Sequence, residues 1–551
     1  MRLIYGGRFR VRFALGAWAI ISTSFASAQA TMDQKAACEE LRNIANLTVL
    51  SAQVVTVEDG GLEYCYLRGL INPAIHYHVQ LPLPDRWNGR FLMWGDGGKD
   101  GDLDFADHRV AEGYAVANSN TGHDSASEPG ASFGFNNRQA EIDFGYRAVH
   151  VTATAARSVI RDYYGRAPEY SYMEGCSTGG RQGLMEAQRF PYDFDGIVAG
   201  APVLHYQATN ISHAFMLQKT FEDNFAGNLA FDTDGNGVPD SLTKANLLSQ
   251  VVLDKCDALD GIRDGVIDDP LACDFEPAVD LEKHICTGDR NADNCFTRRQ
   301  VRTIRDFYSG PYDSRGVNIM KGKSLGSEWA WPNSNIPHVG NNLRPVNLGY
   351  VGDHLNFLFY EEDPGLPPPD VTDLSYKPHR GGELPEFVWW EFNYDDVTSG
   401  KGDLMASITD ALDPDLGRYL TVNGGKLILY HGWSDFSPAP EPTLDYYREM
   451  VDETFEGNME EARRHARIFM VPGMGHCGGG PGPNEWDKLP ALVDWVERGR
   501  APDHVVVTHE TDGRVDNERK VCAYPQKAVY SGPAGGRQDP ANWREENFTC
   551  R

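Results

Sequence analysis

Ser177 lies in the glycine-rich stretch EGCSTGG at 174–180, between an apolar-polar alternation at 169–173 and a helical pattern that begins near Arg181. A serine framed by glycines where a strand gives way to a helix is typical of a nucleophile elbow, because bulky side chains prevent the sharp turn. An ordinary glycine-rich turn would have the same composition. Ser177 is therefore a candidate nucleophile that needs a base, an orienting acid and an oxyanion hole.

An aspartate and a histidine follow two later predicted strands. The strand at 426–430 leads into HGWSD, which ends at Asp435, and the strand at 467–471 leads into PGMGHCG, which contains His476. Serine, acid, histidine is the chain order of α/β-hydrolases. In this interpretation His476 takes the proton of the serine and returns it to the leaving alcohol, while Asp435 fixes the imidazole tautomer. Asp445 is a competing acid, but it does not directly follow a strand.

Another glycine-rich stretch, GDGG, follows a predicted strand at 90–94. In α/β-hydrolases one oxyanion donor is the N–H of the residue after the nucleophile, here Thr178, and the other comes from an early loop between a strand and a helix. Gly97 or Gly98 is the candidate for this second donor. An ordinary turn is the alternative interpretation of the GDGG stretch.

The elements that must position these residues alternate between strand and helix. The expected strands are 75–81, 90–94, 114–118, 169–173 and 196–201, and the expected helices are 138–164 and 181–189. This order predicts a parallel α/β sheet with helices on both faces, and so an α/β-hydrolase core.

From 203 to 412 the alternation stops, and the segment is rich in Pro, Gly and Trp and contains four cysteines. A structureless insertion of this length is implausible, so we expect a disulfide-stapled lid domain inserted between the nucleophile region and the Asp/His strands. The predicted organisation is a signal peptide (1–28), two core parts (29–202 and 413–551) and the lid (203–412).

The first 28 residues predict export. Four arginines precede an apolar run that is too short to span a bilayer as an anchor, and a small-residue cleavage site, ASA, follows. Removal of this segment takes the formal net charge from −28 to about −32. Such acidity disfavours nucleic acid and anionic membranes as partners. We therefore expect a secreted or periplasmic protein with a small-molecule substrate, and its oligomeric state is left open.

The ten cysteines suggest disulfides rather than metal thiolates in an exported chain. Proximity in the sequence suggests four pairs: Cys38 with Cys65, Cys256 with Cys273, Cys286 with Cys295, and Cys522 with Cys550. Two cysteines remain, Cys176 beside the nucleophile and Cys477 beside the base. If bonded, they would clamp the two catalytic loops together, although ten cysteines permit many other pairings.

Two acidic loops in the lid segment could bind a hard cation. In the first, at 256–268, aspartates alternate with glycines, and carboxylates with backbone carbonyls suit calcium, although an acidic solvated loop is the alternative. The second, at 232–240, matches the start of an EF-hand-type loop but has Thr243 where a bidentate glutamate is needed. It is at most a weak second site.

The combined motifs resemble the tannase and feruloyl esterase family, which includes mono(2-hydroxyethyl) terephthalate hydrolases. The resemblance is carried by GCSTGG at 175–180, HGWSD at 431–435, GHC at 475–477 and the spacing of the ten cysteines. It implies serine ester hydrolysis and a calcium ion in the lid. The family's calcium motif falls on these positions: Asp257, Asp260 and Asp264, with the carbonyls of Ile262 and Val266.

The sequence therefore predicts a secreted serine esterase for aromatic carboxylic esters, with gallate, ferulate and terephthalate half-esters left open. Trp329 and the Trp389–Trp390 pair could face an aromatic substrate, although buried lid core is the commoner role for such residues. The alternatives are an esterase for non-aromatic acyl groups and a calcium-dependent binding protein on a hydrolase scaffold.

Overall fold

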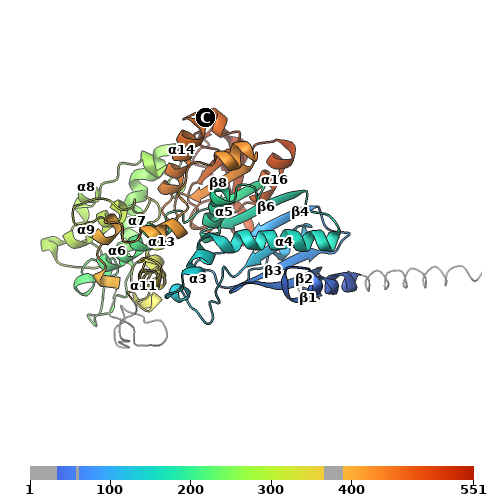
Figure 1. Ribbon diagram of the computed structural model, residues 1–551. Coiled ribbons are helices and arrows are strands. Elements are labelled where there is room, and N and C mark those ends of the chain that lie inside the picture. Colours follow the sequence, from blue (N-terminus) through green and yellow to red (C-terminus); the bar gives the residue numbers. More distant parts are fainter. Residues whose placement is uncertain (1–33, 58–60, 365–388) are drawn as a thin grey trace, which may run out of the picture.

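The computed structural model describes residues 34–57, 61–364 and 389–551 (Figure 1). The predicted signal peptide, 1–28, lies outside the described residues. Among the helices of these three ranges, none combines the length and the apolar character needed to cross a bilayer.

A nine-stranded mixed sheet forms the core, in the spatial order β1-β2-β3-β5-β4-β6-β7-β8-β9. Its strands are β1 (Thr48–Thr56), β2 (Glu63–Ile71), β3 (Ile75–Pro82), β4 (Arg90–Trp94), β5 (Ala115–Ser119), β6 (Tyr170–Cys176), β7 (Gly196–Gly200), β8 (Lys426–Gly432) and β9 (Ala466–Val471). The pairs from β5 through β9 are parallel, whereas β1, β2 and β3 pair antiparallel at one edge. Parallel strands buried on both faces explain why most of these segments are largely apolar, although β6 also buries the polar side chains of Ser171 and Glu174.

Helices cover both faces of this sheet. The core helices are α2 (Asp107–Ala111), α3 (Arg138–Ile142), α4 (Ala148–Tyr164), α5 (Thr178–Arg189), α14 (Glu441–Phe455), α15 (Met459–Ala462) and α16 (Leu489–Arg498). Apolar residues of α4, α5 and α14 form one hydrophobic cluster with the sheet. Residues of α2 and α16 form a second cluster. The predicted helix at 138–164 is real, but a π-helical turn at Asp143–Arg147 separates α3 from α4.

The lid insertion, 201–425, runs from the end of β7 to the start of β8 and lies to one side of the sheet, in green through yellow to orange in Figure 1. Its described helices are α6 (Tyr206–Phe225), α7 (Thr243–Cys256), α8 (Pro277–Asp280), α9 (Arg298–Ser309), α10 (Trp331–Ser334), α11 (Leu348–Phe357), α12 (Asp395–Thr398) and α13 (Asp403–Thr409). They enclose hydrophobic clusters of their own. The insertion therefore has its own core, as a separately packed lid requires.

The C-terminal part adds two small antiparallel sheets. They are formed by β10 (His504–Thr511) with β11 (Arg514–Cys522), and by β12 (Ala528–Tyr530) with β13 (Phe548–Cys550). The Cys522–Cys550 disulfide joins β11 to β13. Valines of β10 and β11 pack with α16, so the hairpin belongs to the core.

All ten cysteines form disulfides, and the four pairs suggested by proximity are confirmed. Cys256–Cys273 and Cys286–Cys295 lie in the lid insertion, whereas Cys38–Cys65 ties the N-terminal segment to β2. The fifth bond, Cys176–Cys477, spans 301 residues of sequence.

Candidate active site

Ser177 lies at the sharp turn between β6 and α5, as the motif predicts. Its backbone has φ 62° and ψ −122°, a conformation that non-glycine residues rarely adopt. The turn is held from both sides, because the Ser177 amide donates to the Gly200 carbonyl at 2.9 Å and the Ser177 carbonyl accepts from the Val203 amide at 3.2 Å. This is the geometry of a nucleophile elbow.

Close packing explains the glycines around Ser177. A Cβ added at Gly175 would lie 2.6 Å from the backbone of Gly179, and one added at Gly179 would lie 2.7 Å from the Asp96 carbonyl oxygen. Helix α5 therefore approaches β6 and the loop after β4 more closely than any side chain allows. This approach brings the loop after β4 next to the serine.

The structure brings together the three predicted catalytic side chains from the carboxyl ends of β6, β8 and β9. His476 Nε2 lies 2.9 Å from Ser177 Oγ, and His476 Nδ1 lies 2.8 Å from Asp435 Oδ2. Both distances are those of hydrogen bonds. The competing acid, Asp445, lies on α14 and pairs instead with Lys321 and Arg448.

Asp435 is fully buried and is surrounded by donors. Its Oδ1 accepts the Ser437 amide at 2.7 Å, and its Oδ2 faces a second imidazole, His431 Nε2, at 3.1 Å. Burial alone would raise the pKa of Asp435, but His476 and His431 outweigh burial and hold this pKa well below its usual value. Conversely, burial lowers the pKa of His476, but Asp435 outweighs it and raises this pKa above 6.5.

His431 is a residue of the candidate site to which the sequence assigned no role. It is fully buried at the end of β8, and its Nδ1 lies 2.9 Å from Thr443 Oγ1. This contact orients the ring so that Nε2 faces Asp435. The sequence offered two signals, a histidine four residues before the acid and its place in the HGWSD motif at 431–435, but neither assigned a role to His431.

The two predicted oxyanion donors lie side by side. Thr178 Oγ1 donates to the Gly98 carbonyl at 2.5 Å, and Gly98, with φ +64°, lines the same cavity as Ser177. The amides of Gly98 and Thr178 have no acceptor within the described part of the chain. Gly97 does not line this cavity, so Gly98 is the better placed of the two glycines.

The Cys176–Cys477 disulfide joins the residue before the serine to the residue after the histidine. It crosses from the end of β6 to the loop after β9, two segments that are not neighbours in the sheet. A covalent link here limits the relative motion of the two loops that carry Ser177 and His476.

The lid insertion closes a cavity of about 80 Å³ over the serine. Beside the catalytic residues, its lining is polar but uncharged, or apolar: Val203, Tyr206, Thr209, Asn210, His213, Val346, Asn347, Tyr350, Phe436, Ser437 and Pro438. The lining has no Lys or Arg among the described residues. Burial lowers the pKa of His213 to about 3, so this imidazole is neutral.

The predicted tryptophans lie outside this lining. Trp389 is buried in the lid core, and the side chain of Trp390 lies outside the description. Trp329 is 42% exposed and lies against Gly475, next to the catalytic histidine loop. A larger cavity of about 460 Å³, bordered by Trp433, Arg448 and Tyr524, does not contain the serine.

Buried lysines of the core and the lid hold the loops of the candidate site. Lys99, next to the oxyanion glycines, donates to the Tyr350 carbonyl of α11 at 3.1 Å. Lys323 of the lid donates to the Phe436 carbonyl, beside Asp435, at 2.6 Å, and burial lowers its pKa to about 7. The lid is thereby tied to both the oxyanion loop and the acid loop.

The acidic loop at 256–268 folds around its own carboxylates. Asp257 accepts the amides of Asp264 and Gly265 at 3.2 Å, and Asp260 accepts the amide of Ile262 at 2.8 Å. Arg519 of β11, 2% exposed, lies among the aspartates, 2.6 Å from Asp264 Oδ2.

Negative charge exceeds positive charge in this loop. Arg519 also faces Asp260 at 3.5 Å and Asp268 at 3.3 Å, so that one guanidinium serves several carboxylates. Burial and, next, the charge of Asp268 raise the pKa of Asp260 to about 7. Within the described residues, the carboxylates of this loop do not bring three ligand atoms within 4.8 Å of one another. Two of the five predicted ligands are backbone carbonyls, however, and surplus buried negative charge suits a divalent cation. The donor set fits calcium.

The second acidic loop, 232–240, is exposed, and Asp232 binds the amides of Gly235 and Gly237 at 2.7 Å. These hydrogen bonds are sufficient to hold the turn of this loop, and no bound ion is needed to account for it.

Comparison with known proteins identifies the family of this chain. The family model described as "Tannase and feruloyl esterase" matches residues 68–542. The chain belongs to the tannase and feruloyl esterase family. It is 33% identical over 543 residues to the mono(2-hydroxyethyl) terephthalate hydrolase of Piscinibacter sakaiensis, covering 89% of this chain and 85% of that protein. It is 31% identical over 481 residues to a probable feruloyl esterase B-1 of Aspergillus flavus, covering 84% and 82%.

The crystal structure of feruloyl esterase B from Aspergillus oryzae superposes with a TM-score of 0.77 at 24% identity, covering 94% of this chain and all of that one. This likeness confirms the α/β-hydrolase core with its inserted lid. As a tannase and feruloyl esterase family member, the chain is a carboxylic ester hydrolase.

Proposed function

We propose that the protein is a secreted serine esterase that cleaves esters of aromatic acids through Ser177, His476 and Asp435. The observation that carries the proposal is the unbroken chain of contacts Ser177–His476–Asp435, at 2.9 and 2.8 Å, with the serine on an elbow. A pure binding protein has no need for this arrangement.

In the first half of the reaction, Ser177 Oγ attacks the ester carbonyl carbon while His476 Nε2 takes the hydroxyl proton. The oxyanion forms next to the amides of Thr178 and Gly98, which are free to donate. His476 then gives its proton to the leaving alcohol, and the carbon–oxygen bond to that alcohol breaks.

In the second half, water attacks the acyl-enzyme and passes a proton to His476. The acid leaves as the serine regains this proton. Asp435 stays ionised throughout, since its pKa is held low, and it stabilises the imidazolium.

The cavity lining favours neutral phenolic acyl groups such as galloyl and feruloyl. Tyr206, Thr209, Asn210 and Asn347 offer partners for ring hydroxyls, while Phe436 offers an apolar wall. The free carboxylate of a terephthalate half-ester would have no fixed cation in the described lining.

We further propose that Asp257, Asp260 and Asp264, with the carbonyls of Ile262 and Val266, hold a calcium ion. When bound, calcium supplies positive charge that offsets the surplus of buried carboxylates. A side chain at Gly473 would meet Val266 at 2.9 Å, so this loop packs against the loop that carries His476. The calcium loop thereby supports the position of the base.

We also propose that the protein is exported. Its support is the signal-like segment at 1–28 and five disulfides.

The test is hydrolysis of methyl gallate, methyl ferulate, mono(2-hydroxyethyl) terephthalate and a short p-nitrophenyl ester by the wild type and Ser177→Ala. We expect the two phenolic esters to be cleaved fastest, with all activity lost in the variant. Activity confined to the aliphatic ester would overturn the aromatic assignment. Turnover that persists in Ser177→Ala would overturn the mechanism.

A further inference from the structure

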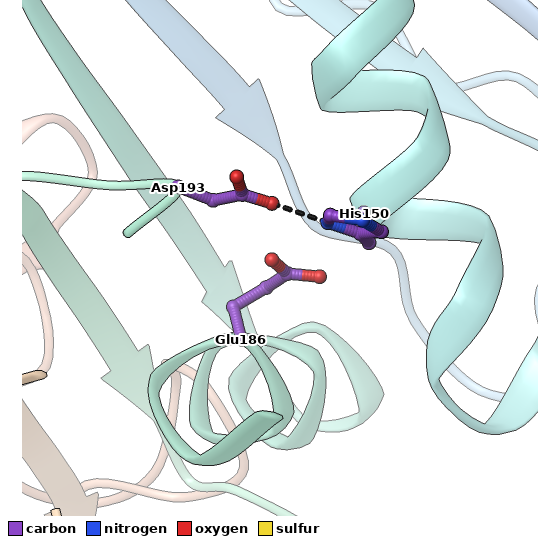
Figure 2. Close-up of side chains that lie close together, drawn as sticks. All are labelled: His150, Glu186 and Asp193. Carbon is purple, nitrogen blue, oxygen red and sulfur yellow. Dashed lines mark hydrogen bonds and ion pairs between the residues drawn. The ribbon is translucent and has the colours of Figure 1, made fainter. Parts of the chain in front are cut away.

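Three side chains that could bind a metal meet between α4, α5 and the start of β7, outside the candidate active site. They are His150 of α4, Glu186 of α5 and Asp193 of the segment before β7, and Figure 2 shows them converging from three sides. One ligand atom from each lies within 4.8 Å of the other two. Small movements would therefore bring all three to one ion.

In the described part of the chain, Glu186 is buried without a hydrogen-bond donor, and the charge of Arg157, which pairs with Asp193, acts on it less than burial and Asp193 do. It is 1% exposed, and neither carboxyl oxygen has a hydrogen-bond partner within the described residues. Figure 2 shows its carboxyl group directed toward the space between Asp193 and His150. A buried carboxyl group without a donor is costly, so this orientation calls for a cation or a proton.

The other two side chains are already held in place. Asp193 Oδ1 accepts Arg157 Nη2 at 2.6 Å, which leaves Oδ2 facing His150 Nδ1 at 2.5 Å. The His150 ring stacks on Phe190 with 3.8 Å between ring centroids. Partners that fix the orientation of ligands in this way are typical of metal sites.

We propose that His150, Glu186 and Asp193 form a binding site for a divalent transition-metal ion of the zinc type. One imidazole and two carboxylates match the ligands of zinc, whereas calcium prefers oxygen alone. Zinc–ligand distances of about 2.0 Å place tetrahedral ligands about 3.3 Å apart. His150 and Asp193 would separate slightly to admit the ion, and water could complete the shell because His150 is 33% exposed.

The site would act on the fold rather than on the substrate. Helix α5 begins directly after Ser177 and carries Glu186 nearer its other end. An ion shared with α4 would pin this helix to its neighbour and so stabilise the elbow from below. This inference does not depend on the substrate.

The rival explanation is a proton shared between Glu186 and Asp193. Burial and then the charge of Asp193 raise the pKa of Glu186 well above its usual value, so a neutral Glu186 could donate to Asp193. This arrangement needs no metal, and zinc titration separates the two explanations.

The experiment is zinc titration of the chelator-treated full-length mature protein by isothermal calorimetry and thermal melting, with calcium in excess throughout. We expect one tightly bound zinc ion, a higher melting temperature and a zinc signal in anomalous diffraction between α4 and α5. Glu186→Gln and His150→Gln should each lower zinc affinity by at least about 100-fold.

The matched control is Glu545→Gln, because Glu518, Glu545 and Glu546 form the other such group in the described part of the chain. This variant should bind zinc like the wild type. Anomalous density at Glu545 instead, or wild-type protein that binds no zinc, would overturn the proposal. The wild-type titration and diffraction remain decisive even if a variant fails to fold.

Discussion

Asp435 and Glu186 are both buried carboxyl groups, 0% and 1% exposed, yet their surroundings differ completely. Asp435 faces an amide and two imidazoles, and its pKa is held low. Glu186 faces another carboxylate, and its pKa is raised. The comparison shows that burial sets the cost of a charge, whereas the partners decide whether the charge persists.

The largest effect should come from Asp435→Asn, which tests the buried carboxylate that is surrounded by hydrogen-bond donors. We expect kcat to fall by about 10⁴-fold, because the amide no longer favours the imidazole tautomer that accepts the serine proton. Asp445→Asn is the control and should keep kcat within about twofold, since its partners are surface cations. Equal losses in both variants would contradict the assignment of the acid.

Removal of calcium tests an intermediate case, in which three carboxylates share the single guanidinium of Arg519. We expect chelation to lower stability by about 4 kcal/mol relative to protein in calcium at a thousand times its Kd. In protein kept free of zinc throughout, added calcium should restore the melting temperature that chelation lowers. Asp260→Asn should abolish this response, and Asp232→Asn in the exposed loop should not. A melting temperature that chelation leaves unchanged would contradict the calcium site.

Glu186→Met tests the buried carboxyl group that lacks a hydrogen-bond donor among the described residues. In chelator-treated protein we expect stability to rise by about 1–3 kcal/mol, because a buried group without a donor is replaced by an apolar one. The control is Glu141→Met, which should destabilise, since Glu141 is also buried, 3% exposed, but pairs with Arg138 at 2.5 Å. The measurement is the urea midpoint of each variant. If both variants lost stability alike, Glu186 would have a partner and the comparison would fail.

The sequence was enough to predict that Ser177, Asp435 and His476 meet, because parallel strands deliver their carboxyl-end loops to one edge of a sheet. Ser177, Asp435 and His476 each follow such a strand, and the cysteines beside two of them gave a second, independent signal. The strands from β3 to β9 were also predicted, but as a parallel sheet, whereas β1, β2 and β3 pair antiparallel. Helix α14 and the hairpin of β10 and β11 were not predicted.

The side-chain contacts between elements could not be predicted. His150, Glu186 and Asp193 meet only because α4 and α5 pack on the same face of the sheet, and no motif spacing records that packing. Arg519 reaches the acidic loop from more than 250 residues away. His431 lies near Asp435 in sequence, but the contact with Thr443 of α14 orients its ring.

His431→Phe gives the smallest expected effect and sharpens the comparison at Asp435 itself. The variant removes one of two imidazoles from the carboxylate while keeping a ring in the buried space. We expect kcat to fall about tenfold, the equivalent of one hydrogen bond to a charged group. Thr443→Val, which removes only the hydroxyl that orients His431, should show a smaller loss.

The pH profile separates positioning from electrostatics in this variant. His476 works as a base only when neutral, and Asp435 raises its pKa, so the acid limb of kcat/KM in the wild type should lie above pH 6.5. Without His431, Asp435 loses a competing donor and holds the proton on His476 more strongly. The acid limb of His431→Phe should therefore move to still higher pH. A tenfold loss with an unmoved limb would mean that His431 only holds the loop in place, and that His476 alone keeps Asp435 charged.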